Sequence, residues 1–374
     1  MHRQWPKPGA AQNAASLPTY PDETGRFAVP ISVQGQEFRF YIDTGAHRHT
    51  MASAVAEILK ASRKKVPGTP EKMTGGEPLS EYTTVKELTL GGLKTPEMTM
   101  YILSNERLRG KDGLLASDLW SHFDVELDYA NGRLNLFEPC SGRAAYWAHS
   151  DGPITIPFTL NSNNHIHVAG TLGDRPIDIR VDTGGSETTP DISRMSYFGL
   201  SPSSPGVRDM GNGLWYRYTF PKLEFGPLSI PNANVAFVSG TRSEVFVGSD
   251  ILRRYHVLIS YKDKTITLTK PSDDPAVSAA LGSFNGAYFA AEDHQWEKTR
   301  DLYGQALANP ALPASYRAAA YFGRSQSFYR LKQCPAAVSD LKAATELDAH
   351  ISDSRRSEPN WYVQTVQKNC PGAP

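Results

Sequence analysis

Asp-Thr-Gly follows an apolar run twice in this sequence, in Phe38-Arg39-Phe40-Tyr41-Ile42-Asp43-Thr44-Gly45-Ala46 and in Ile177-Asp178-Ile179-Arg180-Val181-Asp182-Thr183-Gly184-Gly185. A single copy of this tripeptide is a weak signal, because glycine after a strand usually marks only a turn. Two copies in matching context indicate a duplicated structural unit.

The sequence downstream of each triplet is also repeated. Two apolar residues and a small residue lead into Ser-Asp, and two strand-like runs follow. The corresponding stretches are residues 114–120 with 246–252, and residues 123–129 with 255–261. They align without a gap at a shift of 132 residues, whereas Asp43 and Asp182 are 139 residues apart. The repeated units therefore differ only in the lengths of their connecting loops.

These motifs resemble those of the retropepsin-like aspartic proteases, over roughly residues 25 to 270. In that family each lobe supplies one aspartate, and the site forms only where two lobes meet. The resemblance implies a mainly β fold, in which two retropepsin-like closed β-barrel lobes of one chain form an intramolecular pseudo-dimer. Ala116 departs from the family pattern, which has glycine there, whereas Gly248 fits it.

The pattern of turns, strands and helical spacing divides the chain into five parts. We expect a disordered N-terminal segment at residues 1–24, lobe 1 at 25–138, a linker at 139–153, lobe 2 at 154–270 and a helical region at 276–374. The helical region resembles a tetratricopeptide helix pair. One pair is too short for a peptide-binding superhelix, so we expect a packing appendage, while a protein partner bound by these helices remains an alternative.

The resemblance assigns catalysis to Asp43 and Asp182. Two carboxylates held together cannot both ionise easily, so they share a proton and can activate water against a peptide bond. Supporting roles fall to Thr44 and Thr183, which would hydrogen-bond the opposite lobe, and to the turn residues Gly45, Ala46, Gly184 and Gly185. Pepsin-like enzymes have a hydroxyl residue where this chain has Ala46 and Gly185. We therefore expect activity from mildly acid to neutral pH.

Each lobe also offers a candidate flap hairpin between its triplet and its second motif. The expected flap and substrate-binding residues are Gly75, Gly76, Gly211, Asn212, Gly213, Trp215 and Tyr216. Asn-Gly is a strong hairpin signal, and glycine-rich tips suit a moving lid. Such flaps would hold an extended polypeptide through main-chain hydrogen bonds.

Composition argues against several other classes of function. The 39 basic and 39 acidic side chains give a net charge of zero, so nucleic acid is not an expected partner. No apolar run is long enough to span a membrane. Two His-x-His pairs, at residues 47–49 and 165–167, lack a recognisable third ligand. We therefore expect surface or groove-lining histidines, with no metal and no cofactor.

The three cysteines suggest a disulfide between Cys334 and Cys370, leaving Cys140 free. Such a bond would fit a periplasmic or secreted protein, although reduced thiols in the cytosol remain an alternative. Residues 1–20 lack the apolar segment of a signal peptide.

The function predicted from the sequence is an aspartic endopeptidase. Two alternatives on the same fold are an inactive peptide-binding protein and an adaptor that acts through its helical tail. In a further alternative within the enzyme class, the lobes pair with those of a second chain.

Overall fold

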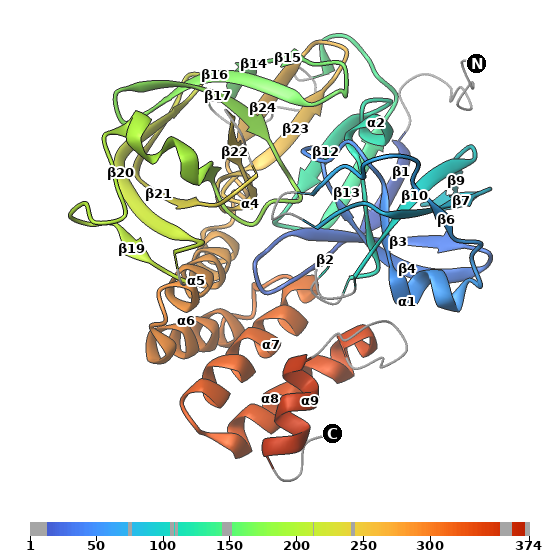
Figure 1. Ribbon diagram of the computed structural model, residues 1–374. Helices are drawn as coiled ribbons and strands as arrows, with labels where there is room; N and C mark the ends of the chain where they lie inside the picture. Colours follow the sequence, from blue (N-terminus) through green and yellow to red (C-terminus); the bar gives the residue numbers. More distant parts are fainter. Residues whose placement is uncertain are drawn as a thin grey trace.

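The computed structural model describes residues 13–73, 77–104, 108, 111–143, 152–211, 213–240, 244–351 and 361–370. The described chain is mixed α/β. Strands dominate up to Thr269, and helices make up the part after Asp274 (Figure 1).

The first large sheet contains Asp43 at the end of one of its strands. Its strands are β2 (Tyr20–Pro21), β3 (Phe27–Val33), β4 (Gln36–Ile42), β5 (Thr50–Ala52), β6 (Lys64–Lys65), β7 (Glu81–Val85), β8 (Leu88–Leu90), β9 (Leu93–Lys94), β10 (Met98–Leu103) and β11 (Gly113–Leu115). Helix α1 (Ser53–Ile58) follows β5. Most pairs are antiparallel, but β5 and β10 run parallel, and so do β4 and β11, with Ile42 opposite Leu115.

The second sheet repeats this arrangement around Asp182. Its strands are β15 (Thr159–Leu160), β16 (Ile166–Leu172), β17 (Arg175–Val181), β18 (Thr189–Pro190), β19 (Arg208–Asp209), β20 (Tyr216–Phe225), β21 (Leu228–Phe237) and β22 (Val245–Val247). The 3-10 helix η2 (Ile192–Phe198) follows β18. Strands β17 and β22 are parallel, with Val181 opposite Val247, so both triplets leave a strand of the same local topology.

A third sheet joins the two halves of the β-rich region. Its strands, in spatial order, are β1 (Asn13–Pro18), β13 (Arg133–Phe137), β12 (Asp124–Asp128), β23 (His256–Ser260), β24 (Thr265–Thr269) and β14 (Ile154–Pro157). Short helices α2 (Ser117–Trp120) and α4 (Ser249–Leu252) precede β12 and β23. At the junction Val125 lies opposite Ile259, and both side chains are fully buried. The halves therefore share a hydrophobic core.

The predicted disorder of residues 1–24 is wrong from Asn13 onward, while residues 1–12 lie outside the described part. Strand β1 pairs antiparallel with β13. Ala15 and Leu17 alternate along β1 and are buried in the common core. The alternation of buried residues along β1 was not recognised in the sequence because the segment is rich in Pro, Ala and Gln. The strand is stabilised by pairing with a partner far along the chain.

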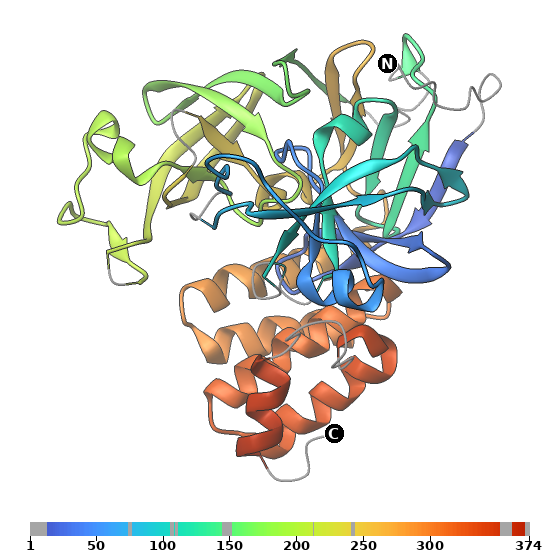
Figure 2. The same ribbon diagram turned by 45° about the vertical axis from the view of Figure 1, so that its right-hand side comes forward.

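The helices pack beneath the β-rich region in both views (Figures 1 and 2). They are α5 (Pro275–Glu292), α6 (Trp296–Ala308), α7 (Ala314–Arg330), α8 (Cys334–Leu347), η3 (Ala349–Ile351) and α9 (Trp361–Asn369). Asp274 caps α5 by accepting from the Ala276 amide at 2.8 Å. Phe284 and Tyr316 lie in the common core, so the helices extend it. No helix in the described ranges is long and apolar enough to cross a membrane.

The predicted disulfide between Cys334 and Cys370 is confirmed, and it ties the start of α8 to the end of α9. Cys140 is free and exposed, as expected. Around the bond lies a second, small core of Leu341, Tyr362, Val363 and Val366. Such a small core contributes little to the free energy of unfolding by itself.

We predict that Cys334→Ser will destabilise this end of the protein. The bond closes a segment with a sequence separation of 36, for which loop-closure entropy gives roughly 3 to 4 kcal/mol. Limited proteolysis should then cut near α9 at lower temperature than in the wild type. Cys140→Ser is the matched control and should behave as wild type. Equal protease resistance in both variants would contradict the expectation.

Candidate active site

The two triplets occupy equivalent places in the structure. Asp43 follows β4, and its amide donates to the Leu115 carbonyl at 3.0 Å. Asp182 follows β17, and its amide donates to the Val247 carbonyl at 2.9 Å. Each triplet loop is thus fixed by the parallel neighbour of its own strand.

The two loops are joined by reciprocal hydrogen bonds between Thr44 and Thr183. Each threonine amide donates to the hydroxyl of the other at 3.1 Å. The hydroxyl of Thr44 donates to the Val181 carbonyl at 2.8 Å, and that of Thr183 to the Ile42 carbonyl at 2.7 Å. Both threonines are buried. The two amides and two hydroxyls therefore have these hydrogen-bond partners only when the two halves meet.

Gly45 and Gly184 allow each loop to approach the opposite aspartate. A Cβ atom on Gly45 would lie 2.5 Å from Cγ of Asp182, and one on Gly184 would lie even closer to Cγ of Asp43. Real Cβ atoms do not come so near another side chain. The glycines are therefore required by packing against the partner carboxyl group, in addition to the turn that the sequence suggested.

Each carboxyl group accepts two backbone hydrogen bonds on one oxygen. Oδ1 of Asp43 accepts from the amides of Gly45 and Ala46 at 3.0 and 2.7 Å. Oδ1 of Asp182 accepts from Gly184 and Gly185 at 3.0 and 2.9 Å. The two carboxyl groups lie close enough for each to affect the protonation of the other. One oxygen of each aspartate is thus anchored, which leaves the other oriented for chemistry.

The electrostatic environment raises the pKa of both aspartates. Burial is the largest cause for each, since a charged carboxylate loses hydration there. The charge of Asp182 raises the pKa of Asp43 further, to well above its usual range. Backbone donors and the Arg180 guanidinium act in the opposite direction on Asp182. Such a pair holds one proton more readily than isolated carboxyl groups do.

Two arginines that the sequence reasoning missed reach across to the opposite triplet. Arg180 donates to the Gly45 carbonyl at 3.4 Å, and Arg26 donates to the Gly184 carbonyl at 3.2 Å. Asp22 holds Arg26 through an ion pair of 2.7 Å. Arg180 could have been suspected from the sequence, because it lies two residues before Asp182 and a strand repeats every two residues. Arg26 carries no comparable signal.

The departure at Ala116 has a local explanation. A Cβ atom on Gly248 would lie 2.6 Å from the Glu187 carbonyl oxygen, so the second half needs glycine. In the first half the Ala116 amide donates to Nδ1 of His49 at 2.9 Å instead. A side chain thus replaces the close backbone contact, and alanine fits. His49 is held in turn by Asp118, at 3.0 Å from its Nε2.

The two His-x-His pairs lie in different surroundings. His47 contacts Glu71 at 2.9 Å, and the ring of His165 is buried, with its centroid 6.0 Å from that of His47. His167 forms a group with Asp178 and Glu244 whose ligand atoms lie within 4.8 Å of one another. Sequence reasoning missed these carboxylates because they lie further along the chain, Asp178 on β17 and Glu244 just before β22.

The group around His167 is already engaged by protein partners. His167 contacts Asp178 at 2.9 Å through Nδ1 and Asn161 at 3.1 Å through Nε2. Glu244 pairs with Arg180. These contacts account for the group without an ion.

The predicted flap residues are only partly described, because Gly75, Gly76 and Asn212 lie outside the described ranges. The structure does describe contacts that flank each of these segments. Lys72 and Pro78 form an antiparallel bridge. In the other hairpin Asp209 accepts from the amides of Gly211 and Gly213 at 2.9 and 3.0 Å.

The two predicted flap aromatics have different exposure. Tyr216 is buried, whereas Trp215 is half-buried beside Arg217. Of this pair, only Trp215 keeps surface for a substrate. The adjacent Leu214 is 75% exposed, which makes it a second apolar contact at this hairpin that sequence reasoning did not select.

A buried network links the second triplet loop to the helices. Glu187, three residues after Gly184, accepts from Arg217 of β20 and from the Tyr288 hydroxyl of α5. Arg217 also pairs with Glu292 at 3.2 Å and is almost fully buried. Helix α5 therefore contacts both the triplet loop and the strand that begins after the hairpin turn.

Comparison with known proteins supports a protease assignment for part of the chain. A sequence model of the aspartyl protease family matches residues 29–119. This range includes Asp43 and Ala116 but not Asp182. No curated protein matches the chain. The family match thus suggests a hydrolase acting on polypeptides. The inclusion of the second triplet in the candidate site is based on the internal repeat and on the geometry described above.

We predict that Thr183→Val will destabilise the protein by roughly 2 to 4 kcal/mol, because it leaves the buried Thr44 amide and the Ile42 carbonyl without their partner. Urea denaturation measures the loss. The control is Thr219→Val, an exposed threonine on β20, which should change stability little. Equal effects of the two substitutions would contradict a special role for the threonine pair.

Proposed function

We propose that this protein is an aspartic endopeptidase that hydrolyses peptide bonds of an extended polypeptide. The observation that supports this best is the reciprocal arrangement of two Asp-Thr-Gly loops, which brings the Asp43 and Asp182 carboxyl groups close enough to affect each other's protonation. The aspartyl protease match over residues 29–119 supports the same reaction class.

In the proposed mechanism a water molecule lies between the outer oxygens of Asp43 and Asp182. The ionised carboxylate takes a proton from the water, whose oxygen attacks the scissile carbonyl carbon. The protonated carboxyl group gives its proton to the carbonyl oxygen, which forms a tetrahedral diol. Collapse of the diol then returns a proton to the departing amine. The anchored oxygens keep both groups oriented, so little reorganisation is needed.

The proposed architecture is an intramolecular pseudo-dimer of two retropepsin-like barrel lobes, residues 25–138 and 154–270, joined by a linker at 139–153. Three observations support it: the matching parallel strand pairs, the reciprocal threonines, and the central sheet in which β12 pairs with β23. We propose that the hairpins at residues 73–78 and 210–216 act as flaps over the substrate.

The helical region, residues 276–374, is proposed to be a tetratricopeptide-like appendage that holds the lobes, with a protein partner as a further possibility. The Glu187 network supports a holding role. A periplasmic or secreted location is proposed from the Cys334–Cys370 bond, since disulfides persist in oxidising compartments.

The central test is Asp43→Asn and, separately, Asp182→Asn. Each should lower hydrolysis of an unbiased peptide library by roughly 10³-fold or more, because the shared-proton pair is lost. Each should also keep or raise stability at neutral pH, since an ionised carboxylate with a raised pKa opposes folding. Asp174→Asn, an exposed aspartate, is the control. Full turnover in either site variant, or no turnover by the wild type, would overturn the proposal.

We also predict an activity profile displaced toward neutral pH. Hydrolysis requires one proton on the pair, and it falls when rising pH removes that proton. Because the pKa of Asp43 is raised well above its usual range, this fall should come at higher pH than for an ordinary carboxyl group, about 4. Ala46→Ser adds a donor and should move the kcat/KM profile to lower pH. An optimum below about pH 4 in the wild type would contradict the expectation.

A further inference from the structure

A buried hydrogen bond joins helix α5 to the loop that follows the second triplet. The Tyr288 hydroxyl donates to the Glu187 carboxylate, which also accepts from Arg217 of β20. Tyr288 is 3% exposed and Glu187 is 8% exposed. A carboxylate without donors would be costly in such a place, because burial removes its hydration. The position of Glu187 is therefore coupled to the position of the helix.

The backbone around Glu187 is in turn packed tightly beside Asp182. A Cβ atom on Gly248 would lie 2.6 Å from the Glu187 carbonyl oxygen and 2.8 Å from the Gly185 carbonyl oxygen. The Gly185 carbonyl accepts from the Ser249 amide at 2.8 Å, and the Gly185 amide donates to Asp182 at 2.9 Å. A displacement of Glu187 would consequently disturb the hydrogen bonds that orient the Asp182 carboxyl group.

The same end of α5 also contacts the two strands on either side of the second candidate flap. Arg208 of β19 and Arg217 of β20 lie directly opposite each other. Glu292 pairs with Arg217 at 3.2 Å, and Asp293, directly after the helix, pairs with Arg208 at 2.9 Å. These two carboxylates offset the repulsion between the two arginines. One end of α5 thus holds both the triplet loop and the flap strands.

The corresponding position in the first half is engaged differently. The shift of 139 residues that relates the two triplets places Arg48 at the position of Glu187. Arg48 carries the opposite charge, and it pairs with Glu71 of the same half at 3.0 Å. Both side chains of this pair are exposed, so the pair contributes little to stability. The buried connection from this position to α5 is therefore a feature of the second half.

From these contacts we infer that Tyr288 is a positioning residue, which sets the placement of Asp182 through Glu187. The docking of the helical region thereby controls one half of the site, because a change at the end of α5 reaches the second triplet and leaves the loop of Asp43 in place. The inference rests on the proposed role of Asp182 in peptide hydrolysis and adds a regulatory role for the helices.

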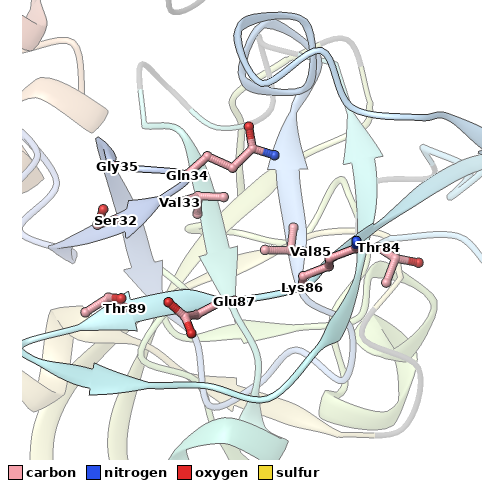
Figure 3. Close-up of a pocket in the computed structure, with 9 residues that line it drawn as sticks. All are labelled: Ser32, Val33, Gln34, Gly35, Thr84, Val85, Lys86, Glu87 and Thr89. Atoms are coloured by element: carbon pink, nitrogen blue, oxygen red, sulfur yellow. The ribbon is translucent and has the colours of Figure 1, made fainter.

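Hydrogen–deuterium exchange of the full chain tests the placement without requiring turnover. In Tyr288→Phe, the slowest amides of residues 182–191 should exchange roughly tenfold faster or more, because a buried carboxylate loses one of its donors. Residues 43–52 should exchange as in the wild type. The segments around Gln34 and Lys86, which line a cavity of about 390 Å³ in the first half, serve as an internal reference (Figure 3).

Tyr362→Phe is the matched control. Tyr362 is 2% exposed and belongs to the small core around the disulfide. Its hydroxyl shares a hydrogen bond of 2.6 Å with Ser325 of α7, so the substitution removes the same group from a contact within the helical region. Exchange over residues 182–191 should stay as in the wild type. Glu292→Gln, at a less buried residue, covers the case in which Tyr288→Phe does not fold, and it should also speed exchange over residues 182–191 through Arg217.

Kinetics test the route through Glu187 on a library peptide that the wild type cleaves. Tyr288→Phe should lower kcat roughly tenfold with little change in KM, because a misplaced carboxyl group slows the chemical step. Glu187→Gln should lower kcat as well. The double variant should be no slower than the slower single variant, because both substitutions act on one contact.

Three results would overturn the inference. They are unchanged exchange over residues 182–191 in both Tyr288→Phe and Glu292→Gln, an equal increase there in Tyr362→Phe, and fully additive losses of kcat in the double variant. A wild type without turnover would instead overturn the proposed hydrolysis, and the exchange results would still decide the role of Tyr288.

Discussion

The hydrogen-bond exchange between Thr44 and Thr183 is the constraint on which the candidate site depends. The hydrogen bonds of each threonine amide and hydroxyl go to the opposite half of the chain. The exchange brings two carboxyl groups together in a buried place, which raises the pKa of both and opposes folding when they ionise. That cost has to be offset elsewhere, and the apolar junction around Val125 and Ile259 contributes.

Segments distant in sequence hold the two loops from outside. Arg26, fixed by Asp22, donates to the second triplet, and Asp22 lies in the segment whose Glu23 carbonyl accepts from Tyr303 of α6. On the other side Glu187 connects the second loop to α5 through Tyr288. The helices therefore contact the surroundings of the site at two points. This gives a physical reason for their attachment to the same chain, because such contacts restrict the motions of the loops relative to each other.

The sequence contained enough information to select Asp43 and Asp182 as the candidate pair and to predict the disulfide, because these depend on repeated motifs and on few cysteines. Other features depend on partners far away along the chain. Strand β1 was missed since its hydrogen bonds go to β13, more than a hundred residues later. Arg26 and Arg217 were missed for the same reason: an isolated arginine has no pattern until folding supplies its acceptor. Long-range pairing, rather than local propensity, decided these cases.

The two halves have diverged while keeping the same motif, and this divergence bears on the proposed chemistry. His49 takes the place in the first half that backbone occupies near Gly248 in the second. Burial raises the pKa of Asp182, and Arg180, two residues earlier, opposes this rise. Burial and the charge of Asp182 both raise the pKa of Asp43. The two identical tripeptides thus lie in different electrostatic environments. The proton nevertheless belongs to the pair, so its loss from the pair, rather than from either aspartate alone, would set the upper pH limit of the proposed reaction.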